Sequence, residues 1–291
     1  MEIMWSLIVF TLCVCISAGT FAVQGLYAVL GRGTKAQLPA LLVAFCALVV
    51  GGIGSFTHLQ HWERAFNGFG HLTSGITQEL IGAALMVVAM AVYFVVSRRQ
   101  ETVPKWAGIM AIVVSVLMIV LMSGSYMMPA RPIWHTPVLY LFYFAEAIVS
   151  GGAVAWVVSA ASKADDIQAL SARITALGGL LVVVAAVAYL AVIGSAHFTA
   201  VGYYYDTNNP TKSMVDSTAF LDSVITGSLA AYFWGTVLLG GLLAAVLGFI
   251  KRKDGASGLF MGAIACIGAI VGGVLFRVML YVLGSSAFLF F

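Results

Sequence analysis

The chain has 291 residues, of which 62% are hydrophobic and only 9% are charged, and its formal net charge is +3. Soluble domains carry about 25% charged residues, so this composition excludes a soluble enzyme. It predicts an all-α integral membrane protein that forms one transmembrane domain over residues 1–291, with no nucleic-acid partner.

Eight apolar runs along the chain are long enough to cross the hydrocarbon core, which takes about 20 residues of α-helix. The runs are unbroken rather than alternating, and an open strand could not satisfy its backbone in lipid, so we expect helices. The predicted spans cover residues 4–30, 38–57, 74–97, 105–123, 136–161, 173–195, 222–250 and 258–283. Most connections are short, so neighbouring spans should pack antiparallel. Residues 196–221 are the exception and are long enough to form a surface platform.

Basic residues are distributed unevenly between the connections. The first, third, fifth and seventh connections hold ten of them, and the second, fourth and sixth hold only three, namely Arg64, Arg131 and Lys212. Because Lys and Arg accumulate in cytoplasmic loops, we expect the odd-numbered connections inside and both termini on the outer, periplasmic side.

Histidines and cysteines give no sign of a metal site. All five histidines fall in or beside even-numbered connections, and none lies at the mid-depth of a span, where a haem between helices would need it. The four cysteines lie in apolar runs, where cysteine behaves as a small hydrophobe, and no Cys-x-x-Cys cluster is present. We therefore expect no haem and no metal in this chain.

Glycines recur within the spans, as at Gly151-Gly152 and in the Gly268-x-x-x-Gly272 spacing. Small residues let membrane helices approach closely, where no hydrophobic effect drives them together. We expect these glycines to serve helix packing.

The connection between the second and third spans concentrates proton-exchanging side chains. It holds His58, His61, His71 and Arg64, and Glu79 follows about four residues into the third span. At 1.5 Å per residue, Glu79 lies roughly 6 Å below the outer end of that span. Quinol oxidation needs such groups, because two hydroxyl protons must be removed. We predict a quinol site with His58 as hydrogen-bond partner and proton acceptor and Glu79 as proton exit; the alternative is an interfacial cluster that caps two helix ends.

Two charged residues lie deeper in the membrane. Glu146 is about ten residues into the fifth span, and Arg277 is about six residues from the outer end of the eighth, on one helical face with Tyr281. Intramembrane charges pair with each other or line a polar cavity. A Glu146–Arg277 ion pair is the structural interpretation, and a transport pathway is the functional one.

The fourth connection, residues 129–137, is rich in proline and aromatic residues. Its prolines fix the backbone as it enters the fifth span. The pattern indicates an interfacial anchor or a docking surface.

These residues together resemble a known family. The family is the membrane-anchor subunit of dimethyl sulfoxide reductase. Its signature resembles Gly52-Ile-Gly54…His58-Leu…Arg64-Ala-Phe66-Asn67…Glu79, Ile133-Trp134-x-x-Pro137 leading to Gly151-Gly152, and the terminal Arg277-x-x-x-Tyr281. The resemblance extends over nearly the whole chain.

The resemblance implies a multi-pass anchor in the bacterial inner membrane. It would bind menaquinol and exchange electrons with a ferredoxin-like iron-sulfur subunit, itself bound to a molybdopterin catalytic subunit. In the family, a histidine and a glutamate that resemble His58 and Glu79 belong to the quinol site, and the anchor carries no haem. The expected catalytic residues are His58 and Glu79, and the expected quinol-binding residues are His58, His61, Arg64, Glu79, Arg277 and Tyr281.

Two other functions are compatible with parts of the sequence. A small-solute or ion transporter would use Glu146 and Arg277 in a central pathway, but neither inverted repeats nor broken mid-membrane helices are visible in the sequence. A purely structural scaffold is the third hypothesis.

Overall fold

The computed structural model describes residues 3–57, 70–129, 131–195, 217–251 and 258–284. These residues form helices joined by turns and contain no strand. The helices are α1 (Trp5–Leu30), α2 (Thr34–Thr57), α3 (Gly75–Arg99), α4 (Lys105–Ser125), α5 (Val138–Ala161), α6 (Asp165–Ser195), α7 (Ser217–Ile225), α8 (Ala230–Gly235), the π-helix η2 (Thr236–Leu243), α9 (Ala244–Lys251) and α10 (Leu259–Leu283). Within the described part, eight helical segments are long and apolar enough to cross a membrane, as predicted.

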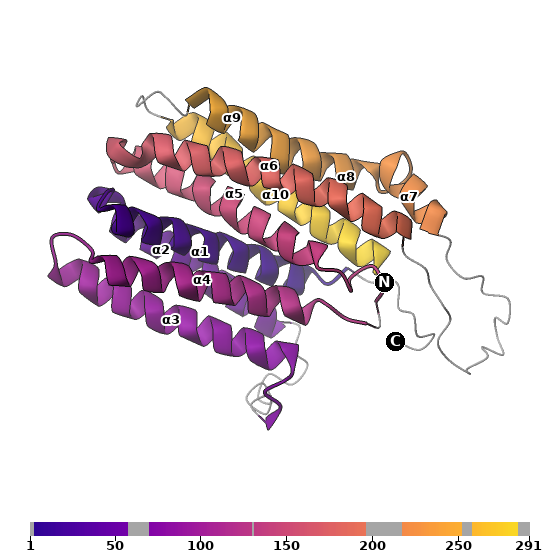
Figure 1. Ribbon diagram of the computed structural model, residues 1–291, viewed down its shortest axis with the longest axis horizontal. Coiled ribbons are helices and arrows are strands. Elements are labelled where there is room, and N and C mark those ends of the chain that lie inside the picture. The colour runs from indigo at the N-terminus through magenta and orange to yellow at the C-terminus, as the bar shows by residue number, and fades with distance from the viewer. Residues whose placement is uncertain (1–2, 58–69, 130, 196–216, 252–257, 285–291) are drawn as a thin grey trace.

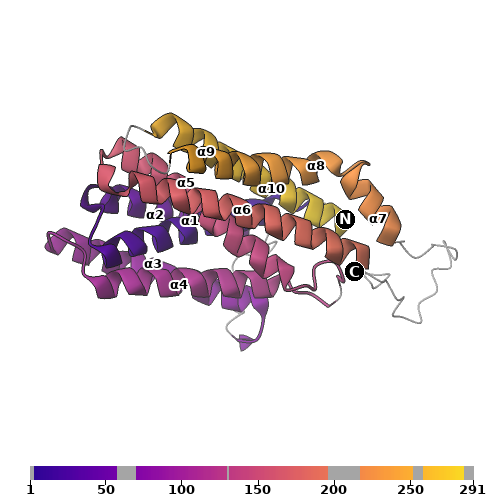
Figure 2. The same ribbon diagram turned by 45° about the horizontal axis from the view of Figure 1, so that its top comes forward.

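The helices run up and down in one bundle, so that successive connections alternate between its two ends (Figure 1). Helix α1 packs against α2, α4 and α5, and α5 packs in turn against α6 and α10. Helices α3 and α10 lie on opposite sides of this arrangement in both views (Figures 1 and 2). The end at which α1 begins and α10 ends is called the cavity end below.

The predicted start of the sixth span is wrong, because the helix begins with polar residues. Helix α6 begins at Asp165 rather than at residue 173, so Arg173 lies within the helix and not in a connection. Asp165 and Asp166 occupy its first turn, where acidic side chains are stabilised by the helix dipole. The Asp166 carboxylate also accepts a hydrogen bond from the Gly33 amide at 2.7 Å. A search for apolar runs misses such a helix start because its residues are polar.

The predicted seventh span, residues 222–250, is wrong as a single helix. Helix α7 ends at Ile225, and a turn separates it from the continuous helix that begins at Ala230. In the turn, the amides of Thr226 and Gly227 both donate to the Asp222 carbonyl. Hydropathy does not register this break, because glycine is neutral in hydropathy yet weak as a helix former.

The packing role predicted for the glycines is confirmed where helices cross. At the α1–α5 crossing, a Cβ on Gly151 would overlap the backbone of Gly19. At the η2–α10 crossing, a Cβ on Gly240 would lie 3.0 Å from the Gly272 Cα. Both crossings therefore need glycine so that the backbones can touch.

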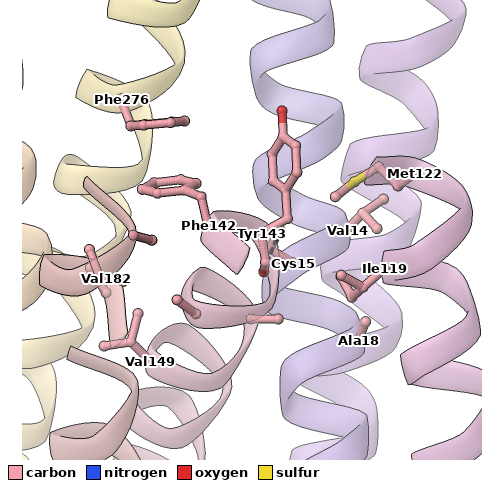
Figure 3. Close-up of a cluster of buried hydrophobic side chains, with 14 of the residues drawn as sticks. Val14, Cys15, Ala18, Ile119, Met122, Phe142, Tyr143, Val149, Val182 and Phe276 are labelled. Carbon is pink, nitrogen blue, oxygen red and sulfur yellow. Dashed lines mark hydrogen bonds between the residues drawn. The ribbon is translucent and has the colours of Figure 1, made fainter. Parts of the chain in front are cut away.

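Aromatic and small side chains fill the core between α1, α4, α5 and α10 (Figure 3). Phe142 on α5 stacks on Phe276 on α10, with ring centroids 3.4 Å apart. The neighbouring Tyr143 points to the other side, toward α1 and α4, among Cys15, Val14 and Met122 (Figure 3). The two adjacent aromatic residues thus fill opposite sides of α5.

Candidate functional site at one end of the bundle

The predicted ion pair between Glu146 and Arg277 is confirmed. Arg277 Nη1 lies 3.5 Å from Glu146 Oε2, and both side chains are almost completely buried. Arg277 also donates from Nε to Thr11 Oγ1 at 2.8 Å and from Nη1 to the Gly273 carbonyl at 2.9 Å. Its Nη2 lies 3.4 Å from Cys15 Sγ. The guanidinium thus links α1, α5 and α10 in the interior of the bundle.

Gly273 gives Glu146 the space for this pair. A Cβ at position 273 would overlap the Glu146 carboxylate. Glu146 Oε1 has no hydrogen-bond partner among the described residues. The pair is therefore a closed contact within the core, and neither Glu146 nor Arg277 lines the cavity described next.

A cavity of about 340 Å³ opens at the cavity end of the bundle. Its walls come from the start of α1, the end of α2, the start of α3, the end of α4 with the connection that follows it, and the end of α10. The lining residues are Met4, Leu7, Ser55, Ser74, Gly75, Ile76, Glu79, Ser125, Tyr126, Met128, Arg131, Trp134 and Tyr281. The volume is at the lower end of the range of small-molecule sites.

Glu79 forms one wall of the cavity. It is the fifth residue of α3 and is half-buried, so the predicted position just below the helix end is confirmed. Its Oε1 accepts a hydrogen bond from the hydroxyl of Ser125, the last residue of α4. The two helices meet closely here, since a Cβ on Gly75 would lie 2.7 Å from Ser125 Cβ. The carboxylate is therefore held in place from α4.

Tyr281 on α10 forms the opposite wall. Its side chain is only 2% exposed, and its hydroxyl has no hydrogen-bond partner of good geometry among the described residues. The Tyr126 hydroxyl approaches it without bonding geometry. A buried hydroxyl without a partner costs free energy. This atom is thus available to a ligand that enters the cavity.

The connection from Tyr126 to Pro137 holds the end of α10. The Trp134 indole donates to the Leu280 carbonyl at 2.8 Å and packs edge-on against Tyr281, with ring centroids 5.3 Å apart. The carbonyl of Ile133 accepts a hydrogen bond from the Tyr189 hydroxyl at 2.9 Å. These contacts agree with the predicted anchor role of this connection. Its docking role remains a prediction.

The structure brings together part of the predicted site. Glu79 and Tyr281 line one cavity, whereas Arg277 lies one helical turn deeper, in the core. His58, His61 and Arg64 lie outside the described residues. Of the remaining histidines, His71 and His135 are exposed at the cavity end.

Among the lining residues that were not predicted as site residues are Ser125, Tyr126, Arg131 and Trp134. Residues 129–137 have a signal in their prolines and aromatics, which indicates an interfacial anchor or a docking surface. Ser125 and Tyr126 had none, because a serine and a tyrosine at a helix end are ordinary there.

The cavity offers groups that suit a flat aromatic molecule with oxygens at its edges. A carboxylate on one wall can accept a hydrogen bond, and a phenol and a guanidinium on the other side can donate one. Tyr126 is a second phenol in the lining. Burial raises the pKa of the Tyr126 phenol well above its usual value, so its hydroxyl stays neutral and can also donate. In the described part of the chain, no cluster of three or more His, Cys, Asp or Glu could hold a metal ion.

The fold and this site define a multi-pass membrane protein with a largely apolar cavity that holds a few polar groups at one end of its bundle. A family model of the DMSO reductase anchor subunit (DmsC) matches residues 1–207, more than half of the chain. The chain belongs to this family and is the membrane anchor of a DMSO reductase-like complex. The family implies association with catalytic and iron-sulfur subunits. No curated protein sequence matches the chain.

The matched residues reach through α6, so they include Glu79, Ser125, Arg131 and Trp134. Tyr281 lies beyond the matched part. The cavity is therefore completed by a helix outside the family match.

Proposed function

We propose that the chain binds menaquinol in the cavity and passes its electrons to a ferredoxin-like iron-sulfur subunit, which delivers them to a molybdopterin catalytic subunit. In this proposal the chain is a single anchor domain in a bacterial inner membrane, with the cavity end facing the periplasm. The main support for this proposal is the half-buried Glu79 carboxylate, which Ser125 holds inside the cavity. The far wall of the same cavity carries the Tyr281 hydroxyl, which has no hydrogen-bond partner among the described residues.

The position of the predicted motif supports the proposal. Residues 58–69, which hold His58, His61 and Arg64, join Thr57 to Gly70. Ser55 on one side of this stretch and Ser74 on the other both line the cavity. The chain therefore enters and leaves the stretch at the cavity.

The side chains have separate roles in the proposed reaction. Glu79 accepts a proton from a quinol hydroxyl, Tyr281 donates a hydrogen bond to the oxygen at the other wall, and Trp134 and Tyr126 pack against the rings. His58 is the proposed hydrogen-bond partner and second proton acceptor. Quinol oxidation releases two electrons, which the iron-sulfur subunit takes up, and two protons, which leave on the side of the cavity.

The transporter alternative has less support. It would place Glu146 and Arg277 on a pathway, but these residues bind each other and line no part of the cavity. Membership in the anchor family also favours the electron-transfer function.

The proposal is tested by comparing quinol-driven with dye-driven turnover in complexes that carry Glu79→Gln or His58→Ala. Glu79→Gln keeps the shape of the side chain and loses the proton acceptor, so quinol-driven turnover should fall at least tenfold while quinol-analogue binding is retained. His58→Ala should weaken analogue binding by more than about tenfold, the equivalent of one hydrogen bond to a charged group. Dye-driven turnover should stay normal in both. Normal quinol-driven rates in both variants, at normal yield, would place the site elsewhere.

A further inference from the structure

Arg131 is the cationic side chain among the described residues that line the cavity. It was predicted as part of a connection that forms an interfacial anchor or a docking surface, and the proposed function gives it no role. Its Nη1 donates to the carbonyl of Gly284 at 2.8 Å, and its guanidinium lies 4.5 Å from the centre of the Trp134 ring. These two contacts fix the position of the charge at the wall that carries Tyr281.

The two walls of the cavity therefore differ in charge. Glu79 and Ser125 come from α3 and α4 on one side, and Arg131 accompanies Tyr281 at the end of α10 on the other. A molecule that spans the cavity has one oxygen near a carboxylate and the other near a guanidinium and a phenol.

This asymmetry matters for the first proton transfer. When a quinol hydroxyl gives its proton to Glu79, one O–H bond breaks and another forms, and the negative charge moves from the carboxylate to the bound molecule. In a partly buried site an uncompensated negative charge is costly. The Arg131 guanidinium at the opposite wall offsets that charge by Coulomb attraction across the bound ring, and the Tyr281 phenol bonds the second oxygen.

We propose that Arg131, with Tyr281, forms an anion-stabilising half of the quinol site, so that the cavity binds the deprotonated form of a naphthoquinol-like ligand in preference to the neutral form. This inference rests on the proposed function, because it assigns a role to a residue of the same cavity. It differs from an anchoring role, in which Arg131 would serve only to hold the end of α10 through Gly284.

The test uses two ligands of nearly equal size and different charge. 2-Hydroxy-1,4-naphthoquinone is ionised at neutral pH, and 2-methyl-1,4-naphthoquinone is neutral. The dissociation constants of both are measured on the purified complex, for the wild type and for Arg131→Gln, Arg131→Lys and Glu79→Gln. Complex yield and dye-driven turnover show whether each variant assembles.

Arg131→Gln should weaken the binding of the anionic ligand by roughly 10- to 100-fold, which is the range expected for the loss of one hydrogen bond between charged groups. It should change the dissociation constant of the neutral ligand by less than about threefold. Arg131→Lys should retain part of the preference for the anionic ligand. Glu79→Gln removes the negative charge on the other wall, so it should bind the anionic ligand at least as tightly as the wild type.

Two outcomes would contradict the inference, and they differ in what they say about the proposed function. If the neutral ligand binds the wild type and Arg131→Gln weakens both ligands equally, Arg131 is only an anchor and this inference fails while the proposed function stands. If neither ligand competes with quinol on the wild-type complex, the proposed function fails with it.

Discussion

Ser125 has two acceptors within reach of one hydroxyl proton. Its Oγ contacts Glu79 Oε1 and lies 2.8 Å from the Met122 carbonyl. When Glu79 is ionised, Ser125 donates to it; when Glu79 carries a proton, Ser125 accepts from it and donates to Met122. The contact thus persists in both protonation states, which a proton acceptor needs if it is to keep its position during turnover.

Ser125→Ala should therefore slow quinol-driven turnover by roughly tenfold, because one hydrogen bond to a charged group is lost. Ser123→Ala is the matched control, since Ser123 is buried two residues away and, among the described residues, its hydroxyl bonds to the Ile119 carbonyl of its own helix. Steady-state rates with a quinol donor and with a dye donor make the comparison. Equal rates in the two variants would show that Ser125 does not position Glu79.

The Glu146–Arg277 pair illustrates the cost of charge in a core. Removing one member leaves the other buried and unpaired, which costs about 3–5 kcal/mol, whereas removing both is often close to neutral. Arg277→Met should therefore lower the yield and thermal stability of the assembled chain sharply.

The double variant Glu146→Met with Arg277→Met should recover most of that stability and keep quinol-driven turnover. Thermal melts and rates of the single and double variants form the measurement. A stable double variant that has lost turnover would show that the pair takes part in function, as the transporter hypothesis requires.

At the scale of the helices, apolar run length predicted eight spans because the bilayer imposes that length. The predicted helix boundaries are wrong where something other than hydropathy determines where a helix begins or ends. Helix α6 begins with polar residues stabilised by the helix dipole, and the break after α7 occurs at Thr226 and Gly227, which hydropathy treats as part of the span.

The close crossing of α1 and α5 predicts how much a methyl group at Gly151 should lower the stability of the complex. Gly151→Ala places a methyl group against the Gly19 backbone, which should cost about 1–3 kcal/mol as overpacking and lower the melting temperature of the complex. Gly52→Ala is the control, because a Cβ at Gly52 meets nothing within 4 Å. Fluorescence-detected melting curves compare the two. A Gly52→Ala effect as large as that of Gly151→Ala would contradict the packing role.

At the scale of the whole molecule, the sequence predicted the components of the site better than their arrangement. Glu79 was found because a carboxylate near a histidine-rich connection is chemically unusual in a membrane protein. The contribution of Ser125 and Arg131 depends on helix ends that meet only in the folded bundle. Arg277 was grouped with Tyr281 by helical spacing, yet one turn of helix separates the core from the cavity.

The unequal distribution of basic residues predicts the sidedness of the bundle. Arg32, Arg98 and Lys105 lie at the end opposite the cavity, so the positive-inside rule places the cavity end outside. Cysteines introduced singly at His71 and at Gln100 probe the two ends. A membrane-impermeant maleimide should label His71→Cys from the outer side of intact cells and should leave Gln100→Cys unlabelled until the membrane is opened. The reverse pattern would invert the proposed orientation.

The claim that the cavity holds the quinol ring is tested most directly by photolabelling. A photoreactive naphthoquinone bound to the intact complex should label peptides that contain Met4, Met128 or Tyr281 after illumination, and excess menaquinol should abolish the label. Labelling that survives excess menaquinol, or that falls on the opposite end of the bundle while these peptides stay unmodified, would contradict a quinol site in this cavity.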